Sequence, residues 1–361
     1  MKLPTTVHAT ILALMASPSS SAATPEKQQQ RTYPARTIYQ FANNATWIEN
    51  IAVRPNGNLL LTLLNPAAEL HEIAFTNDND NSAEARLVHH FAAYQGLLGI
   101  AETRPDAFAV IAGNYTTSPP SWALWGVDFS GTAEAGDNAS AAKINELVPD
   151  VPGGKVLNGL TTVRQSPSSP SGYDDDDDGD AAVLLMSDST AGTVMRVELS
   201  SPPRIDVVLP ADNRTTSPPP DDPSHATGVN GVRYQRADGY LYFANTYREL
   251  FCRVRVDPDG EGVGQVEVLA EGGFKGDDFA LRWEGGEEGG LVAYVMDGVD
   301  GEMVRVVVGS GEKEVVVLEE GGQAVEAKPT AAAWGRRAGV DEDVLYVVTR
   351  DRKVLAVDLG S

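Results

Sequence analysis

The sequence has 361 residues and carries 51 acidic against 28 basic side chains, a formal net charge of −23. Apolar residues make up 42% and charged residues 22%, a composition typical of globular rather than disordered chains. Such a negative protein repels phosphate backbones, and no apolar run after the N-terminus is long enough to span a bilayer, so we expect neither nucleic acid nor a membrane as a partner. The 35 glycines and 22 prolines require many turns, which favours an all-β protein.

The N-terminal segment is typical of a secretory signal peptide. Lys2 precedes an apolar stretch from Val7 to Ala16, and small residues follow up to Ala23. We therefore predict a signal peptide over residues 1–23, a flexible leader over 24–35, and localisation in the secretory pathway or outside the cell. Four N-x-[ST] triplets agree with that route and mark candidate glycosylation sites at Asn44, Asn114, Asn138 and Asn213.

One strand pattern recurs six times along the rest of the chain. A short apolar segment comes first, then two alternating strands joined by a polar turn, and then a third strand. In the first copy these strands are Asn58–Leu63, Ala68–Ile73 and Ala85–Phe91. The six short segments begin near Asn50, Leu98, Leu157, Val229, Asp278 and Pro329. Four strands in each of six copies predict a six-bladed β-propeller over residues 36–361, whereas a pair of β-sandwiches would not explain a sixfold repeat.

The two ends of the repeat complement each other. The last copy ends without a third strand, and Arg36–Phe41 near the N-terminus matches the third-strand pattern. We expect this N-terminal segment to pair with the last copy and close the ring, because that pairing leaves no terminal strand edge exposed.

Polar residues occupy the starts of the predicted innermost strands, which converge on one face of a propeller channel. These residues are Glu49, Gly99, Asn158, Asn230, Asp277 and Lys328. Two carboxylates and two side-chain amides suit a hard divalent cation, above all Ca²⁺. The pattern predicts a metal site formed by Glu49, Asn158, Asn230 and Asp277. The alternative is that these residues only stabilise turns at strand starts, which explains the Asn and Asp residues better than Glu49.

Other chemistries find little support in the sequence. The single cysteine, Cys252, excludes an intramolecular disulfide and alternates with apolar neighbours, which predicts a small buried side chain. No His-based zinc spacing, G-x-S-x-G elbow or G-x-G-x-x-G turn is present, so no organic cofactor is expected. Trp47 is predicted at the channel mouth, where it can stack on an apolar ligand, and the other four tryptophans are expected in blade cores.

Several short motifs resemble the senescence marker protein/gluconolactonase/regucalcin superfamily. They are Glu49–Val53, Val229–Val232 with Asp238–Tyr242, and Gly276–Ala280. The resemblance implies a six-bladed propeller with a divalent metal on the channel axis, held by Glu49, Asn158, Asn230 and Asp277. At Asp277–Asp278 this sequence departs from the Asp-Gly pair that is usual in the family.

A longer set of motifs resembles the fungal secreted branch of this superfamily: Ile48–Thr62, Leu98–Glu102 and Phe108–Asn114. Some members of that branch act as hetero-Diels–Alderases, which join tropolone o-quinone methides to sesquiterpenes such as humulene. The resemblance implies a pericyclase with a small-molecule substrate. Its candidate catalytic residues are Trp47, Asn158, Asn230 and Asp277, with Arg233 as a further hydrogen-bond donor at the channel mouth.

Two other functions remain open. In a Ca²⁺-dependent lactonase or esterase, the ion polarises a carbonyl oxygen and Asp277 activates water. A propeller can also bind a metabolite or a partner without catalysis. The oligomeric state does not follow from the sequence.

Overall fold

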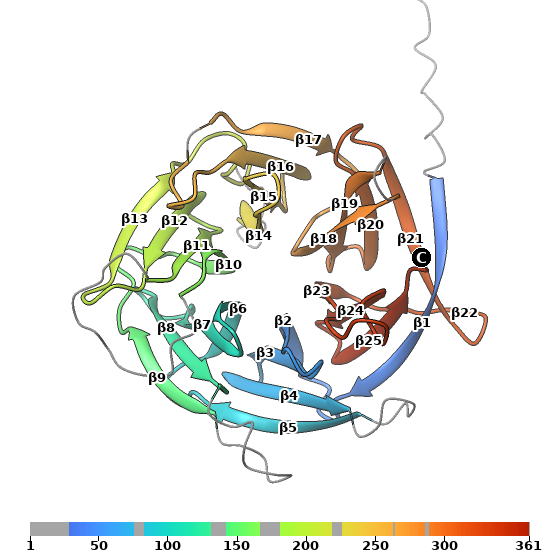
Figure 1. The fold of residues 1–361 in the computed structure, drawn as a ribbon, viewed down its shortest axis with the longest axis horizontal. Helices are drawn as coiled ribbons and strands as arrows, with labels where there is room; N and C mark the ends of the chain where they lie inside the picture. The colour runs from blue at the N-terminus through green and yellow to red at the C-terminus, as the bar shows by residue number, and fades with distance from the viewer. Residues whose placement is uncertain are drawn as a thin grey trace, which may run out of the picture.

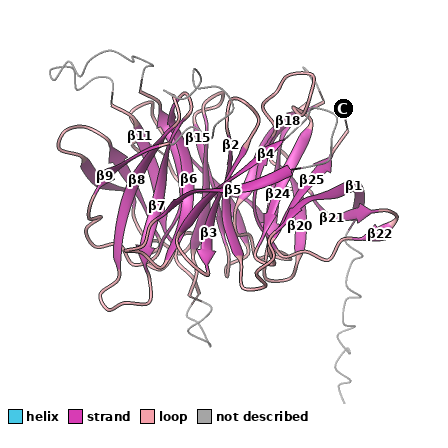
Figure 2. Ribbon diagram, turned by 90° about the horizontal axis from the view of Figure 1, so that it is seen from below, coloured by secondary structure: helices cyan, strands magenta, loops and turns pink. Residues whose placement is uncertain are grey.

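The computed structural model describes residues 29–75, 83–130, 142–166, 181–218, 226–262, 264–285 and 289–360. The predicted signal peptide, residues 24–28 of the predicted leader and the Asn138 triplet lie outside these ranges. Within them every regular element is a β-strand, and none of the described segments is a helix that could span a membrane. The strands form sheets around a central axis (Figure 1) and run between the two faces of the ring (Figure 2).

Four separate sheets, each of four antiparallel strands, make up most of the ring. The first contains β2 (Trp47–Val53), β3 (Leu59–Asn65), β4 (Glu69–Phe75) and β5 (Ala83–His90), and the second contains β6 (Gly96–Arg104), β7 (Ala107–Asn114), β8 (Ser121–Asp128) and β9 (Lys143–Val148). The third contains β10 (Leu157–Arg164), β11 (Val183–Asp188), β12 (Thr193–Glu198) and β13 (Arg204–Leu209). The fourth contains β14 (Val229–Gln235), β15 (Tyr240–Asn245), β16 (Leu250–Arg255) and β17 (Glu267–Glu271). The first strand of each sheet lies nearest the axis (Figure 1).

The remaining strands form one continuous nine-stranded sheet. Its order begins with β18 (Phe279–Glu284), β19 (Gly290–Asp297), β20 (Glu302–Val307) and β21 (Lys313–Glu320), with the short β22 (Gln323–Ala324) paired to β21. It continues through β1 (Gln29–Gln40) to β25 (Lys353–Asp358), β24 (Val344–Thr349) and β23 (Pro329–Trp334). The prediction of an all-β, propeller-like fold is therefore confirmed. The strands of the six predicted repeats, however, lie in four separate sheets and one continuous sheet, not in six separate sheets.

Strand β1 closes the ring because its two halves pair with different strands. Residues 35–40 pair antiparallel with β25, as the sequence predicted, and residues 29–34 pair parallel with β21. The closing strand thus begins at Gln29, within the segment predicted as a flexible leader, and that prediction was wrong for residues 29–35. The reason is that the outer edge of β21 would otherwise leave its backbone N–H and C=O groups unpaired.

Apolar side chains fill the space between neighbouring sheets. Leu61 of β3 packs in one buried cluster with Ile38 of β1 and Val348 of β24, across the junction between the first and last sheets. Leu124 of β8 and Leu184 of β11 share another cluster between the second and third sheets. Because side chains alternate along a strand, each sheet contributes apolar residues to both of its neighbours, and the core is continuous around the ring.

Close backbone contact joins several of the innermost strands near the axis. A Cβ atom on Gly99 would lie 2.5 Å from the carbonyl oxygen of Asn158, and one on Gly159 would lie 2.6 Å from that of Asn230. Gly231 N–H donates a hydrogen bond to the carbonyl oxygen of Asp277 at 2.8 Å. Residues with a side chain could not occupy these glycine positions without moving the strands apart.

Hydroxyl groups bridge other junctions of the inner ring. Thr62 Oγ1 donates to the carbonyl oxygen of Leu98 at 2.7 Å, and Thr330 Oγ1 donates to that of Ile48 at 2.7 Å. These buried contacts fix the inner strands relative to one another, and with them the side chains that face the channel.

A chain that begins at Phe41 lacks β1 and should be less stable, because the edges of β21 and β25 are then exposed together. We expect its melting temperature to fall by roughly 5–10 °C and the protein to aggregate as its concentration rises. The matched control is a chain that begins at Gln29, which keeps β1 and should melt like the longer chain. Equal melting temperatures for the two truncations would contradict the closing role of β1.

Candidate functional site

Two cavities lie at opposite ends of the channel. The first has a volume of about 390 Å³ and lies where the inner strands start, and we call it the carboxylate cavity after Glu49 and Asp277. The second has a volume of about 350 Å³ and is lined by later residues of the same strands, and we call it the arginine cavity after Arg233.

The carboxylate cavity brings together the residues that the sequence singled out. It is lined by Trp47, Glu49, Asn158, Asn230 and Asp277. Trp47 and Glu49 both lie in the first half of β2, where the pairing with β3 is irregular. These positions come together because the inner strands start at the same end of the ring.

Three other predicted positions lie elsewhere. Gly99 contacts the backbone of Asn158, and Lys328 is exposed and does not line the cavity. Arg233, predicted at the same mouth, lies three residues beyond Asn230 on β14 and lines the opposite cavity, so that prediction was wrong. Each strand residue advances about 3.3 Å, which carries Arg233 roughly 10 Å further along the channel.

Residues that the sequence did not single out complete the walls. They include the apolar or aromatic Leu64, Leu98, Tyr115, Trp122, Val156 and Val299, and the polar Thr227, Thr246, Tyr247, Lys275 and Arg350. The Arg350 guanidinium lies 5.5 Å from the centre of the Trp47 ring, a cation–π contact at the rim. Lys275 Nζ donates to Asp300 at 2.6 Å. Several of these residues lie in the connections between strands, where the repeat pattern of the sequence does not predict the position of a side chain.

At the base of the carboxylate cavity, which we call its floor, two polar side chains have oxygen atoms without hydrogen-bond partners. Asn230 Nδ2 donates to Asp277 Oδ1 at 2.8 Å and to Thr246 Oγ1 at 3.0 Å, which fixes the orientation of both Asn230 and Asp277. Asn230 Oδ1 and Glu49 Oε2 are buried and have no hydrogen-bond partner among the described residues. Buried acceptors without partners are costly, so this floor is suited to a group that supplies positive charge or a proton.

The two carboxyl groups at the floor hold protons more tightly than usual. Burial raises the pKa of Glu49 to about 7, and the negative charge of Asp278 adds to the rise. Trp47 opposes that rise, although its indole N–H does not reach hydrogen-bond geometry with Glu49. Burial, together with the charges of Glu49 and Asp278, raises the pKa of Asp277, against the opposing effects of Asn230 and Arg350. Near neutral pH this floor is therefore expected to hold a proton or to bind a cation.

The oxygen atoms at the floor of the carboxylate cavity are of the chemical type that binds a divalent cation. Glu49 and Asp277 supply carboxylate oxygens, and Asn158 and Asn230 supply amide oxygens, all of them hard donors. The unpartnered Oε2 of Glu49 and Oδ1 of Asn230 are the atoms that an ion would satisfy. In the described part of the chain no cluster of three or more His, Cys, Asp or Glu side chains could hold a metal, so such an ion would depend on the amides.

Asp278, where the sequence departs from the family pattern, does not line the carboxylate cavity. Its carboxylate forms an ion pair with Arg233 and accepts hydrogen bonds from Asn50 Nδ2 at 2.9 Å and from the Phe279 backbone N–H at 2.8 Å. The second aspartate is thus held by contacts deeper in the channel. Of the two aspartates, only Asp277 lines the carboxylate cavity.

The structure describes three of the four predicted glycosylation sites. Asn44 and Asn213 are exposed, whereas Asn114 is half-buried and its Nδ2 donates to Ala93 O and Ser121 Oγ, both at 3.1 Å. Asn44 and Asn213 are therefore the more accessible candidates, and modification of any site stays a prediction.

Two side-chain predictions outside the cavity have different outcomes. Cys252 is fully buried, as predicted, and its burial raises the pKa of the thiol to about 12. Trp283, expected in a blade core, is 53% exposed, so that prediction was wrong. It alternates with inward residues at the end of β18, so its ring faces away from the core.

No protein-family model matches the chain. A curated protein named "Putative hetero-Diels-Alderase" from Phoma sp is 26% identical over 350 residues, which is 91% of each chain. A protein named "Putative hetero-Diels-Alderase asR5" from Sarocladium schorii is 33% identical over 88 residues, or 24% of this chain and 21% of that one. A solved structure of the calcium-binding protein regucalcin from Agrobacterium tumefaciens matches with a TM-score of 0.56 at 14% identity, over 91% of this chain and 96% of that one. The chain is similar in sequence to hetero-Diels–Alderase-named proteins and in fold to regucalcin, as the motifs predicted.

Substitution of Glu49 by Gln should change how stability depends on pH. Because the pKa is raised from 4.5 to about 7, the folded protein keeps a proton in this range that the unfolded chain has lost. The wild type should therefore lose roughly 1–3 kcal/mol of unfolding free energy relative to Glu49→Gln as the pH rises through this window. Denaturant unfolding between pH 4.5 and 8 measures the difference. Glu84→Gln on the exposed edge strand β5 is the control, and a constant difference between wild type and Glu49→Gln across this range would contradict the argument.

Proposed function

We propose that this chain is a pericyclase of the hetero-Diels–Alderase type that acts on small molecules in the carboxylate cavity. The observation that carries the proposal is an apolar and aromatic wall above a floor of carboxyl groups with raised pKa values. A relative that matches nearly the whole chain carries a hetero-Diels–Alderase name. A cycloaddition requires orientation of two partners and few polar groups, which such a cavity offers.

The proposed substrates are a tropolone o-quinone methide and a sesquiterpene such as humulene. The sesquiterpene is a hydrocarbon and needs only apolar contact, for which Leu64, Leu98 and Val156 are available. The quinone methide is flat and its heterodiene ends in a carbonyl oxygen, so its ring suits the Trp47 indole and that oxygen suits a hydrogen-bond donor at the floor.

The chain's proposed contribution is a hydrogen bond to that oxygen. In the cycloaddition one C–C and one C–O bond form together, and no proton, oxidant or reductant is consumed. A carboxyl group that stays protonated near neutral pH donates to the oxygen of the heterodiene and makes the diene more electron-poor. Asn230 positions Asp277 through its 2.8 Å hydrogen bond, while Glu49 supplies the second carboxyl of the pair.

We also propose that the nine-stranded sheet acts as the fifth and sixth blades, joined by β1. Its two inner strands, β18 and β23, lie on the same inner ring as those of the four separate sheets (Figure 1). The backbone N–H of Asp278 donates to the carbonyl oxygen of Thr330 at 3.1 Å, which joins these two units near the axis.

A Ca²⁺-dependent lactonase or esterase is the second candidate, favoured by the unpartnered oxygens of Glu49 and Asn230. Glu49, Asn158, Asn230 and Asp277 would hold the ion, which would polarise the carbonyl of a substrate. Both carboxyl groups would then be ionised, whereas the pericyclase needs one of them protonated. The two candidate functions therefore require opposite protonation states of the same pair.

Product stereochemistry tests the pericyclase, because a protein that orients both partners changes the ratio of diastereomers even where the reaction proceeds without it. The purified protein, given a tropolone quinone methide precursor and humulene, should produce one diastereomer in excess of the uncatalysed mixture. The excess should persist in EDTA and should fall as the pH rises above about 7, since Glu49 then ionises. Trp47→Ala should reduce the rate by about tenfold, while the control Lys328→Ala, outside the cavity, should not change it.

Three results distinguish the candidates. The same diastereomer mixture with and without protein would rule out the pericyclase. Hydrolysis of simple lactones that is lost in EDTA and rises with pH would favour the lactonase. Binding without turnover of either substrate would leave a metabolite-binding propeller.

A further inference from the structure

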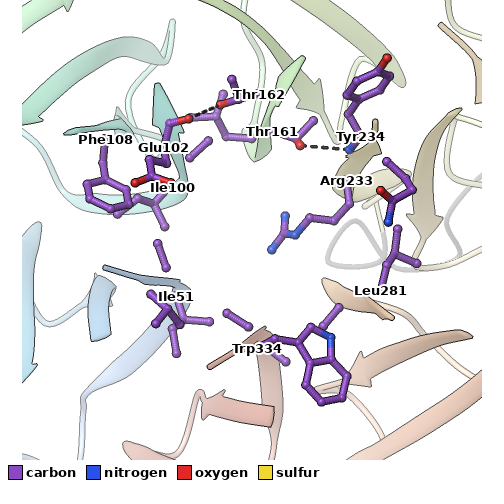
Figure 3. A pocket seen from close by; sticks show the side chains of 18 residues that line it. Ile51, Ile100, Glu102, Phe108, Thr161, Thr162, Arg233, Tyr234, Leu281 and Trp334 are labelled. Atoms are coloured by element: carbon purple, nitrogen blue, oxygen red, sulfur yellow. Dashed lines mark hydrogen bonds between the residues drawn. The ribbon is translucent and has the colours of Figure 1, made fainter. Parts of the chain in front are cut away.

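The arginine cavity at the far end of the channel plays no part in the function proposed above. Figure 3 shows the Arg233 side chain extending from β14 toward its centre, with Trp334 and Ile51 on the opposite wall. Its apolar lining comes from five inner strands and from β7, the second strand of its sheet: Ile51, Ile100, Leu160, Leu281 and Trp334, with Phe108 on β7. A cavity of about 350 Å³ with such walls is comparable in size to the smaller ligand pockets of proteins.

Most polar groups around this cavity are already hydrogen-bonded within the protein. Thr161 Oγ1 accepts from the Tyr234 backbone N–H at 3.0 Å, and Thr162 Oγ1 donates to the carbonyl oxygen of Glu102 at 2.8 Å (Figure 3). The Glu102 carboxylate accepts from the Asp106 backbone N–H at 2.9 Å and forms an ion pair with Arg336 at 2.9 Å. These groups therefore offer little to a ligand.

Arg233 differs from them because its guanidinium keeps donors for a ligand. Nη1 donates to the carbonyl oxygen of Val232 at 2.9 Å, and Nη2 donates to Asp278. A guanidinium has five N–H donors in a planar fork, so these two contacts do not exhaust it. Asp278 is held from two other directions, by Asn50 and by the Phe279 backbone, so it does not depend on Arg233 alone.

A second donor on the opposite wall also lacks a partner. Trp334 Nε1 is buried and has no hydrogen-bond partner among the described residues, and Trp334 lines both this cavity and a neighbouring pocket beside Arg282. The donors of Arg233 and the apolar walls around them indicate a ligand with an acceptor group and an apolar body.

We propose that the arginine cavity is a second small-molecule site, which takes a flat apolar molecule with one carboxylate. The carboxylate accepts from the remaining N–H donors of the Arg233 guanidinium, a charge-assisted contact. The apolar body lies against Leu281, Ile51 and Trp334 and loses its contact with water. This site is distinct from the carboxylate cavity, with which it shares no lining residue.

Titration with 2-naphthoate, followed by calorimetry, tests the proposal on the purified protein. The wild type should bind one equivalent, and methyl 2-naphthoate, which has the same ring and no charge, should bind at least about tenfold more weakly. Arg233→Gln should weaken naphthoate binding by about the same factor. Failure of the wild type to bind, or equal affinity for the acid and its ester, would overturn the proposal.

Two further variants locate the site even where Arg233→Gln fails to fold. Leu281→Trp fills the cavity while it keeps the Arg233–Asp278 ion pair, so it should abolish naphthoate binding. Trp47→Ala changes only the carboxylate cavity and should leave the affinity unchanged. Binding that survives Leu281→Trp, or that is lost in Trp47→Ala, would place the ligand elsewhere and overturn the proposal.

Discussion

Close backbone contact between neighbouring inner strands is the constraint on which the channel and both cavities depend. Gly99, Gly159 and Gly231 allow three of these contacts, because a Cβ at any of them would meet the backbone of the next strand. Hydrogen bonds such as the one from Gly231 N–H to the carbonyl oxygen of Asp277 hold these strands close together, which narrows the channel between its two ends. At this narrow level the Asp278–Arg233 ion pair and Asn50 Nδ2 form a buried polar cluster. The two cavities are separate as a consequence.

The same rigidity explains the chemistry of the carboxylate cavity. Glu49 lies on an inner strand and Asp277 lies two residues before one, so the two carboxyl groups cannot relieve their repulsion by moving into water. Their ionised forms remain costly, and the cost is offset by the large apolar core between the sheets. A proton or a divalent cation removes the repulsion. One arrangement of residues can thus support hydrogen-bond catalysis or metal chemistry, and the occupant of the floor decides between them.

The parts of the molecule that repeat could be predicted from the sequence, and those that do not repeat could not. The recurring strand pattern located the inner strands, and the residues at their starts, such as Glu49 and Asn230, line one cavity. Lys275 and Arg350 were missed because they lie between strands, where nothing in the pattern fixes their position. The first half of β1 is polar, Gln29 to Thr32, and its parallel pairing with β21 gives no alternation to detect. Propensity indicates strands, but contacts between distant segments decide which strand edges are covered.

The Asp277–Asp278 pair connects the two ends of the channel. Consecutive side chains of an extended segment point in opposite directions, so Asp277 lines the carboxylate cavity while Asp278 pairs with Arg233. The charge of Asp278 contributes to the raised pKa of both Glu49 and Asp277, and Arg233 is the cation that compensates this charge. The Asp278–Arg233 ion pair therefore links the charge near the floor of the carboxylate cavity to the guanidinium that lines the arginine cavity.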